Sequence, residues 1–221
     1  MDIISAFDVI GPIMIGPSSS HTAGALRIAL LARGMVRDTI VGARFTLYGS
    51  FAETYRGHGT DRALVAGILG FGTEDRKIKD SFTYAQQAGL VYSFVCDTTR
   101  RDLHPNTVEI ELTDAHGHAT MVQGVSLGGG RAEIRAINGI EVRLTGEYST
   151  VLIHQTDAPG VLAYITRVLS EQNINIAFLK LYREKRGETA YTIVEADQEI
   201  PQAVVHEMEQ HPSIHSAILV A

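Results

Sequence analysis

Hydrophobic and polar residues are spaced differently in the two parts of this 221-residue chain, and the change comes near residue 147. The second part is the more regular. Apolar residues recur at helical spacing between Val161 and Ser170, directly after Pro159 and Gly160, which favour the start of a helix. The elements expected in this part are a strand at Tyr148–His154, a helix at Val161–Ser170, strands at Asn175–Tyr182 and Thr189–Ala196, a helix at Pro201–Gln210 and a strand at Ile214–Val220.

The order of these elements, β-α-β-β-α-β, is the ferredoxin-like split βαβ plan. This plan builds an antiparallel sheet with both helices on one face. We therefore expect an α+β protein with two domains. The first, a mixed α/β domain, is expected at 1–147, and the second, the ferredoxin-like domain, at 148–221.

The first part of the chain mixes helical and strand-like segments with glycine-rich turns. Three consecutive glycines, Gly128–Gly130, predict a tight turn. The pattern predicts a short helix at Ile3–Ile10, a loop at Gly11–Ser20, helices at His21–Met35 and Arg62–Leu69, and strands at Ile40–Tyr48, Val91–Cys96, Thr107–Leu112 and Arg131–Ile137.

Composition argues against several classes of protein. The formal net charge is −6, whereas nonspecific nucleic-acid binding needs a basic surface. Apolar runs fall short of the roughly 18–20 residues that span a bilayer. The N-terminal segment MDIISAFDVIGP has neither the basic region nor the cleavage site of a signal peptide. We therefore expect a cytoplasmic protein that binds neither nucleic acid nor membrane.

Cysteine and histidine usage limits the metal chemistry of this chain. Cys96 is the only cysteine, so an intrachain disulfide is excluded, and an iron–sulfur cluster usually needs several thiolates. We expect this thiol to be buried within an apolar strand. The nine histidines show no convincing zinc spacing, so no metal ligand is predicted. His116 and His118 are expected on the surface, in a turn.

Candidate chemistry is concentrated in the segment Ile15–Arg27, IGPSSSHTAGALR. Three serines and His21 meet the start of an alanine- and leucine-rich helix. A helix N-terminus presents free N–H groups, and serine hydroxyls add donors, so the segment suits a carboxylate or a phosphate. The imidazole of His21 suits donation to that anion or proton movement near neutral pH. The alternative is a serine N-cap with hydroxyls filling a turn, but three serines before His-Thr-Ala-Gly favour a functional loop.

Three further motifs carry weaker signals. Glycines on both sides of His58 leave little bulk near its ring, so a ligand can approach closely, although a plain loop histidine fits equally well. Asn106, in the motif HPNT, offers an amide to a substrate or simply forms a turn. The motif SLGGGR at Ser126–Arg131 fits N–H groups converging on an anion, and it fits a hairpin turn equally well.

Together, the motifs IGPSSSHTAGALR, GHGTDRA, LHPNT and SLGGGR resemble one family, and they occur in the same order there. That family is the β chain of the two-subunit, iron–sulfur-dependent bacterial L-serine dehydratases, and the resemblance covers essentially the whole chain. The segment HQTDAPGVLAYITRVLSEQNINIAFLKLYRE is similar to an ACT domain, a ferredoxin-like fold that often binds amino acids. The N-terminal part is also similar to the allosteric substrate-binding domain of some 3-phosphoglycerate dehydrogenases.

The resemblance implies a lyase that converts L-serine to pyruvate and ammonia. In this family a 4Fe–4S cluster on the partner α chain acts as a Lewis acid on the substrate hydroxyl. The resemblance makes His58 the first candidate for the base that takes the Cα proton, with His21 holding the substrate or serving as the alternate base. Asn106 would orient the substrate. Its carboxylate would be anchored by Ser18, Ser19, Ser20 and Thr22.

The ACT-like segment carries a separate set of expectations. By resemblance to serine-binding ACT domains, His154 matches a histidine of the regulatory site, and Asn175 matches an asparagine contributed across a domain pair. Thr156 departs from the pattern, because it stands where another asparagine is expected. Three alternatives stay open: an amino-acid site, a monovalent-cation site built from loop carbonyls, and a dimerisation module only. The homodimer contact is expected in this domain.

Two other functions are compatible with the same motifs. One is a non-catalytic regulatory subunit that binds amino acids, and the pair His21 and His58 argues against it, because a sensor does not need two proton-active rings. The other is a fragment of a 3-phosphoglycerate dehydrogenase. The sequence lacks the G-x-G-x-x-G nucleotide site that a complete dehydrogenase would carry.

Overall fold

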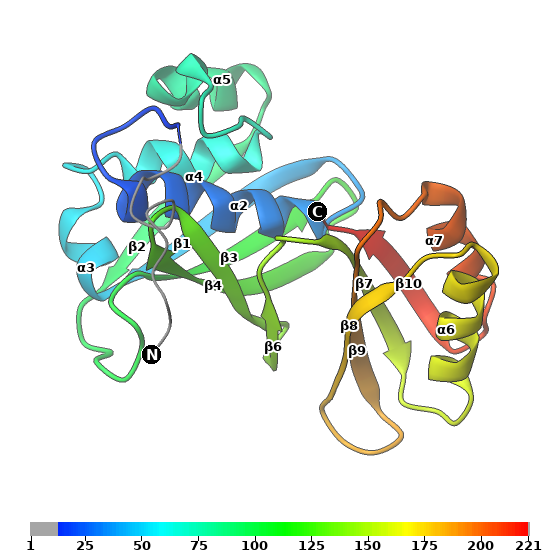
Figure 1. The fold of residues 1–221 in the computed structure, drawn as a ribbon. Coiled ribbons are helices and arrows are strands. Elements are labelled where there is room, and N and C mark those ends of the chain that lie inside the picture. Colours follow the sequence, from blue (N-terminus) through cyan, green and yellow to red (C-terminus); the bar gives the residue numbers. More distant parts are fainter. Residues whose placement is uncertain (1–12, 221) are drawn as a thin grey trace, which may run out of the picture. The chain divides into compact units, whose positions relative to one another are not determined.

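The structure, a computed structural model, describes residues 13–220, which form two units around separate β-sheets (Figure 1). The chain divides between Gly139 and Ile140. The helix expected at Ile3–Ile10 lies outside the described residues. No helix within residues 13–220 is long and apolar enough to cross a membrane.

The first sheet has the strand order β2-β1-β3-β4-β5-β6. β2 runs parallel to β1, whereas β1 with β3, β3 with β4, and β4 with β5 form antiparallel pairs. β6 is the last strand in this order, and it belongs to the second of the two units. The strands are β1 (Ile40–Tyr48), β2 (Val91–Asp97), β3 (Thr107–Asp114), β4 (Ala119–Gly128), β5 (Arg131–Ile137) and β6 (Ile140–Leu144).

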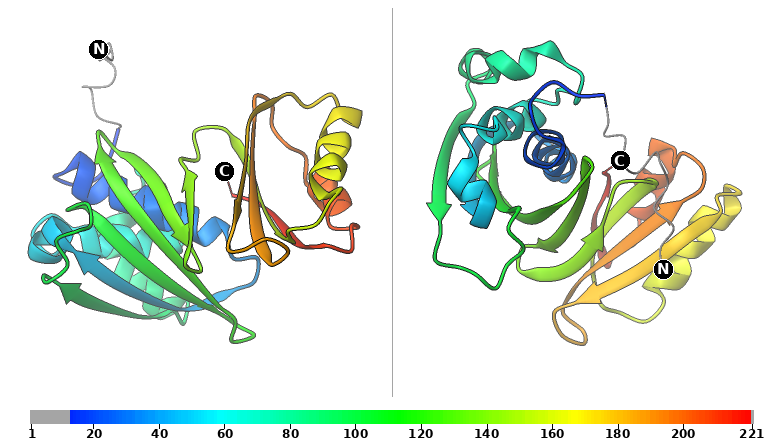
Figure 2. Two further views of the ribbon diagram at one scale, coloured as in Figure 1. Left: turned by 90° about the horizontal axis from the view of Figure 1, so that it is seen from below. Right: turned by 60° about the vertical axis from the view of Figure 1, so that its left-hand side comes forward.

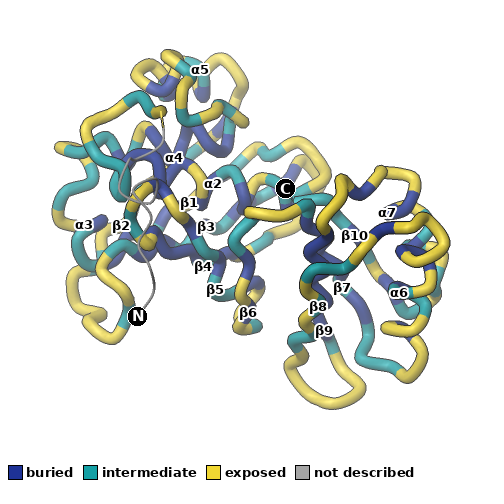
Figure 3. Tube along the Cα trace, viewed as in Figure 1, coloured by how far each residue is buried: buried dark blue, intermediate teal, exposed yellow. Residues whose placement is uncertain are grey.

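Two helices, α2 (Ala25–Gly34) and α4 (Thr60–Ile68), pack against each other over one face of this sheet (Figures 1 and 2). Small residues permit the close approach: a Cβ added to Gly67 would lie 2.5 Å from the Cβ of Ala29 and 2.6 Å from the carbonyl oxygen of Leu26. Buried residues concentrate where these helices meet the central strands (Figure 3). The remaining helical elements are η1 (Ser19–Gly24), α3 (Gly49–Thr54), η2 (Arg76–Asp80) and α5 (Ser81–Gln87).

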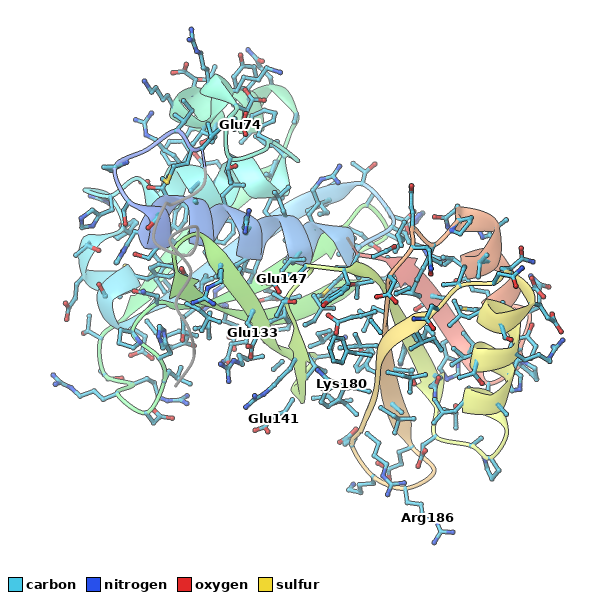
Figure 4. All side chains as sticks on the ribbon, viewed as in Figure 1. Glu74, Glu133, Glu141, Glu147, Lys180 and Arg186 are labelled. Carbon is cyan, nitrogen blue, oxygen red and sulfur yellow. The ribbon has the colours of Figure 1, made fainter. Side chains whose placement is uncertain are left out.

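The second unit has a sheet of order β10-β7-β9-β8, with two helices on one face (Figure 1). Its core is apolar and fully buried at Val151, Ile165, Val194 and Val205. At the tip of the β8–β9 hairpin, Arg186 extends away from the unit (Figure 4). The elements are β7 (Ser149–Thr156), α6 (Val161–Glu171), β8 (Ile176–Arg183), β9 (Thr189–Ala196), α7 (Gln202–Met208) and β10 (Ile214–Leu219).

The fold class expected from the sequence is confirmed. The second unit has the β-α-β-β-α-β order, and β1, β5 and β9 begin and end at the predicted residues. The helix expected from His21 starts at Ser19 as a π-helical turn and becomes α-helical at Ala25. The glycines of SLGGGR form the β4–β5 hairpin turn, with φ of +90°, +60° and +79°. The pattern missed five elements: α3, η2, α5, β4 and β6.

The expectation that Cys96 is buried is wrong. Its side chain is exposed on β2, which lies at the edge of the first sheet. Two apolar residues of the same strand, Val91 and Val95, are also 74% and 37% exposed. An apolar strand sequence indicates a strand, but it does not tell whether another strand will cover its outer edge.

Candidate active site

The serine-rich loop forms a π-helical turn whose side chains gather at one point. Ser18 is the N-cap, with an extended backbone, and its hydroxyl accepts a hydrogen bond from the backbone N–H of His21 at 3.1 Å. The Oγ of Ser20 lies 3.2 Å from Nδ1 of His21, and the Oγ of Ser18 lies 3.5 Å from the same nitrogen. π-Helical turns are rare and are often found at functional sites.

The loop's own N–H groups are partly occupied by this cap. The backbone N–H groups of Thr22 and Ala23 donate to the carbonyl of Ser18, at 2.9 and 3.4 Å. The sequence therefore predicted correctly that serines meet a helix start, and Ser18 is the N-cap that the alternative interpretation expected. An anion here would rely on hydroxyls more than on the free N–H groups expected from a plain helix N-terminus.

Helix α3 supplies the second wall of the site. The Oγ of Ser50 lies 2.9 Å from Nε2 of His21, so both ring nitrogens of this histidine have hydroxyl partners. The ring of Phe51, which is fully buried, meets the ring of His21 edge-on at 5.3 Å between centroids. The imidazole of His21 is therefore held in one orientation by polar contacts at its nitrogens and an apolar contact at its side.

His58 lies next to His21, as the resemblance requires. The two ring centroids are 4.9 Å apart and the rings are tilted by 44°. Gly59, at φ +69°, turns the chain directly into α4 in a conformation that favours glycine. The Nδ1 atom of His58 is buried and has no hydrogen-bond partner among the described residues. A buried polar atom without a partner is unusual, so this nitrogen is available to a ligand.

Thr22 connects the two histidine segments. Its side chain is buried, and its hydroxyl donates to the carbonyl oxygen of His58 at 2.8 Å. The position does not suit the contact with a substrate carboxylate that was expected from the sequence. Thr22 instead fixes the distance between the serine loop and the backbone of His58.

Electrostatics favour a neutral ring at His21. Burial lowers the pKa of His21 below 6.5, and the neighbouring His58 lowers it further. At neutral pH the His21 imidazole is therefore uncharged, with one nitrogen protonated and the other free to accept a hydrogen bond.

The motif SLGGGR supports the serine loop from β4. Ser126 is fully buried, and its hydroxyl donates to the carbonyl oxygen of Ser20 at 2.9 Å. Its backbone N–H donates to the carbonyl oxygen of Asn106 at 3.0 Å. The side-chain oxygen of Asn106 is buried without a partner among residues 13–220. Asn106 is thus linked to the serine loop through Ser126, with an acceptor atom unused.

The motif HPNT also packs against α3. The carbonyl oxygen of Pro105 accepts a hydrogen bond from the N–H of Phe51 at 3.2 Å. Gly49, at φ +50°, lies so close that a Cβ on it would be 2.8 Å from the Cα of Pro105. All four motifs that the sequence singled out therefore meet around His21. Sequence reasoning missed the contacts of Ser50 and Ser126. Ser50 belongs to no motif, and the motif of Ser126 was interpreted through its glycines, as an anion-binding or hairpin turn.

The three residues expected to form the regulatory site of the second unit do not meet in one protomer. The ring of His154 stacks on Tyr191 at 5.1 Å, whereas Thr156 contacts Nε2 of His215 through its hydroxyl at 2.9 Å. Asn175 precedes β8 at the opposite end of the sheet, where its amide donates to Asp197. His154 therefore shares an end of the sheet with Thr156 and not with Asn175.

Comparison with known proteins identifies the family. The profile of the family described as serine dehydratase beta chain matches residues 5–93, and that of the ACT domain matches residues 149–213. The chain is 44% identical over 200 residues to the L-serine dehydratase beta chain of Peptoniphilus asaccharolyticus, a match that covers 90% of each chain. This chain belongs to the family of L-serine dehydratase beta chains. A probable L-serine dehydratase beta chain of Bacillus subtilis is 39% identical to it over 217 residues, 98% of each chain.

The beta chain also shares a more distant likeness with dehydrogenases. A D-3-phosphoglycerate dehydrogenase of Mycobacterium tuberculosis is 26% identical over 133 residues, which are 58% of the beta chain but 25% of the dehydrogenase. That limited coverage, beside the two full-length matches, separates the beta chain from a dehydrogenase fragment.

Proposed function

We propose that this beta chain supplies substrate-binding and acid–base groups for the conversion of L-serine to pyruvate and ammonia, in a complex with the alpha chain. The observation that carries the proposal is the pair of imidazoles 4.9 Å apart beside the hydroxyls of Ser18 and Ser20. The free Nδ1 of His58 and the free side-chain oxygen of Asn106 add two groups that await partners.

The carboxylate of L-serine would be held by the serine hydroxyls. Ser18 and Ser20 lie with their Oγ atoms 3.4 Å apart, so two hydroxyls can face the two oxygens of one carboxylate. Ser19 belongs to the same half-buried turn. Asn106 would orient the substrate through its amide, and an ammonium group is the natural donor to its unused oxygen. Fixed donors of this kind position the Cα–H bond for removal of its proton.

His58 would act as the general base. The Cα proton moves to a ring nitrogen of His58, which becomes an imidazolium, while the Cβ–O bond breaks and its electron pair leaves with the oxygen as hydroxide. The proton of the imidazolium then converts the hydroxide to water and returns His58 to its neutral form. The aminoacrylate that results then hydrolyses to pyruvate and ammonia. Because two protonated imidazoles this close would repel each other, a neutral His21 makes proton uptake by His58 easier.

An iron–sulfur cluster, if this enzyme uses one, must have its ligands on the alpha chain. Cys96 is the only cysteine of the sequence, and residues 13–220 contain no group of three His, Cys, Asp or Glu side chains that could hold a metal ion. The beta chain alone therefore does not fit a 4Fe–4S cluster. We assign the cluster to the alpha chain, where it would supply Lewis-acid assistance to the departing hydroxyl.

The second unit suggests a regulatory role in addition to catalysis. Along β9, His154 is level with Tyr191, whereas Asn175 lies beyond Ala196. Five residues of strand separate those positions by roughly 17 Å. One amino-acid site that uses both His154 and Asn175 would thus need two copies of the chain, and β8 is an edge strand of its sheet. We propose a homodimer through the ACT domain, with the amino-acid site between the copies.

Replacement of His58 tests the catalytic proposal. In the reconstituted complex of alpha and beta chains, we expect His58→Ala to lower kcat by about 10²–10⁴-fold, the usual contribution of a general base. His206→Ala is the matched control, since His206 is largely exposed on α7 and lies in the other unit. A fall in kcat of less than tenfold, with the complex intact, would remove His58 as the base and favour a regulatory subunit without catalytic groups.

A further inference from the structure

Ser50 has no assigned role, yet it makes the shortest polar contact of the His21 ring. Its Oγ lies 2.9 Å from Nε2, whereas the two serine hydroxyls on the other side lie 3.2 and 3.5 Å from Nδ1. Ser50 is the second residue of α3, and the same helix carries the buried Phe51 that packs on the ring. The polar contact and the apolar contact of the ring thus come from one helix.

The direction of these hydrogen bonds decides what the serine loop can bind. A neutral imidazole has one N–H and one acceptor nitrogen. If the proton is on Nε2, then Nδ1 must accept, and a hydroxyl proton of Ser20 or Ser18 is used inside the protein. If the proton is on Nδ1, both of these hydroxyls serve as acceptors toward the ring. One of their protons can then bridge Ser18 and Ser20, whose Oγ atoms are 3.4 Å apart, and the other stays for a ligand.

A carboxylate ligand favours the second arrangement, because it needs hydroxyl protons from the loop. In that arrangement the Oγ of Ser18 accepts the backbone N–H of His21 at 3.1 Å together with the ring N–H, which leaves its own proton to donate. The backbone of Ser20 is held separately, because its carbonyl oxygen accepts the buried hydroxyl of Ser126 at 2.9 Å. With the ring proton on Nδ1, the loop thus offers a hydroxyl proton from a backbone that is held in place, as an anionic ligand requires.

We propose that Ser50 is a positioning residue that donates its hydroxyl proton to Nε2 of His21 and thereby keeps the ring proton on Nδ1. The chain of hydrogen bonds then runs from Ser50 through His21 to Ser20 and ends at the carboxylate of the substrate. This inference rests on the proposed function for the identity of the ligand. The tautomer of His21 does not depend on turnover and is tested by itself.

The first measurement is the ring ¹⁵N spectrum of His21 in the full-length ¹⁵N-labelled beta chain at about pH 8, where the ring is neutral. We expect the proton on Nδ1 in the wild type and a mixture of tautomers in Ser50→Ala. Ser50→Thr keeps the hydroxyl and should restore the Nδ1 proton. Thr54→Ala, which removes a hydroxyl from the same helix that donates to the carbonyl of Ser50, should leave the tautomer unchanged.

The second measurement uses the reconstituted complex. Because loss of the Ser50 hydrogen bond weakens the binding of the carboxylate, KM for L-serine should rise roughly three- to tenfold in Ser50→Ala, with a smaller change in kcat. Ser50→Thr should recover most of that loss.

A wild-type proton on Nε2, or an unchanged tautomer and KM in Ser50→Ala, would overturn the assignment of Ser50. An active His58→Ala enzyme would overturn the base and leave the ring tautomer as it is measured. The two failures are therefore distinguishable.

Discussion

The two imidazoles of the candidate site influence each other's charge. Burial is the larger cause that lowers the pKa of His21, and the Coulomb interaction with His58 adds to it. The centroids are 4.9 Å apart, so protonation of one ring disfavours protonation of the other. His21 therefore stays neutral beside the proposed base.

This coupling predicts a titration that an NMR experiment can follow. The His21 ring of the wild-type chain should titrate below 6.5, and His58→Gln should raise its pKa without restoring 6.5, because burial remains. Between the lowered pKa of the folded state and pH 6.5, the folded chain binds fewer protons at His21 than the unfolded chain does. The contribution of His21 to the free energy of unfolding is therefore fully present above pH 6.5, and it is lost as the pH falls from 6.5 through the folded-state pKa. An unchanged His21 pKa in His58→Gln would show that the rings are not coupled.

At the scale of elements, glycines at the contacts allow η1 and α2 to pack closely against β4. A Cβ on Gly24 would lie 2.0 Å from the Oγ of Ser126, and a Cβ on Gly124 of β4 would lie 2.2 Å from the Cγ2 of Ile28. These contacts bring the end of β4 against η1, which places Ser126 under the carbonyl of Ser20. The geometry of the serine loop thus depends on the packing of a strand that is distant in sequence.

The same contacts explain which elements the sequence could predict. Apolar residues that alternate with other residues, as in Ile40–Tyr48, reveal a strand by themselves, and the serine motif marks a helix start. β4 was missed because Gly124 looks like a strand breaker until the side chain of Ile28 is seen against it. α3 was missed because six residues are too few to show a helical period, and its place depends on Pro105. Ser50 lies on α3, so its contact with His21 could not be found from the sequence either.

Gly24→Ala tests the contact between η1 and β4. Alanine normally stabilises a helix relative to glycine by about 1 kcal/mol, but here we expect a loss of about 1–3 kcal/mol from overpacking against Ser126. Urea unfolding of the full chain measures the difference in the free energy of unfolding between Gly24→Ala and the wild type. Gly72→Ala is the control, because a Cβ on this exposed glycine meets no atom within 4 Å.

A double variant makes the same test specific. Ser126→Gly removes the side chain that a Cβ on Gly24 would meet, so Gly24→Ala should cost less in that background than in the wild type. Strict additivity of the two changes would contradict the contact, whereas a favourable coupling would support it.

For the whole molecule, the separation of His154 from Asn175 bears on how many chains make one regulatory site. The two residues lie at opposite ends of one sheet, so a single copy cannot place both on a small amino acid. A two-fold pair of ACT domains would bring the His154 end of one copy against the Asn175 end of the other, and would do so twice. Thr156 stands near the His154 end, with its hydroxyl on His215.

Mixing two defective chains tests this arrangement directly. We expect the full-length beta chain to bind L-serine saturably in equilibrium dialysis at millimolar concentration, and we expect His154→Ala and Asn175→Ala each to lose that binding. In an equal mixture, half of the dimers pair one variant with the other, and each mixed dimer has one site with both residues intact. About one quarter of the sites should therefore return by the statistics of a two-fold pair.

To keep the serine loop from contributing, every chain carries His21→Ala. No recovery on mixing would place the site within one chain, and no saturable binding in the parent chain would leave the ACT domain a cation site or a dimerisation module.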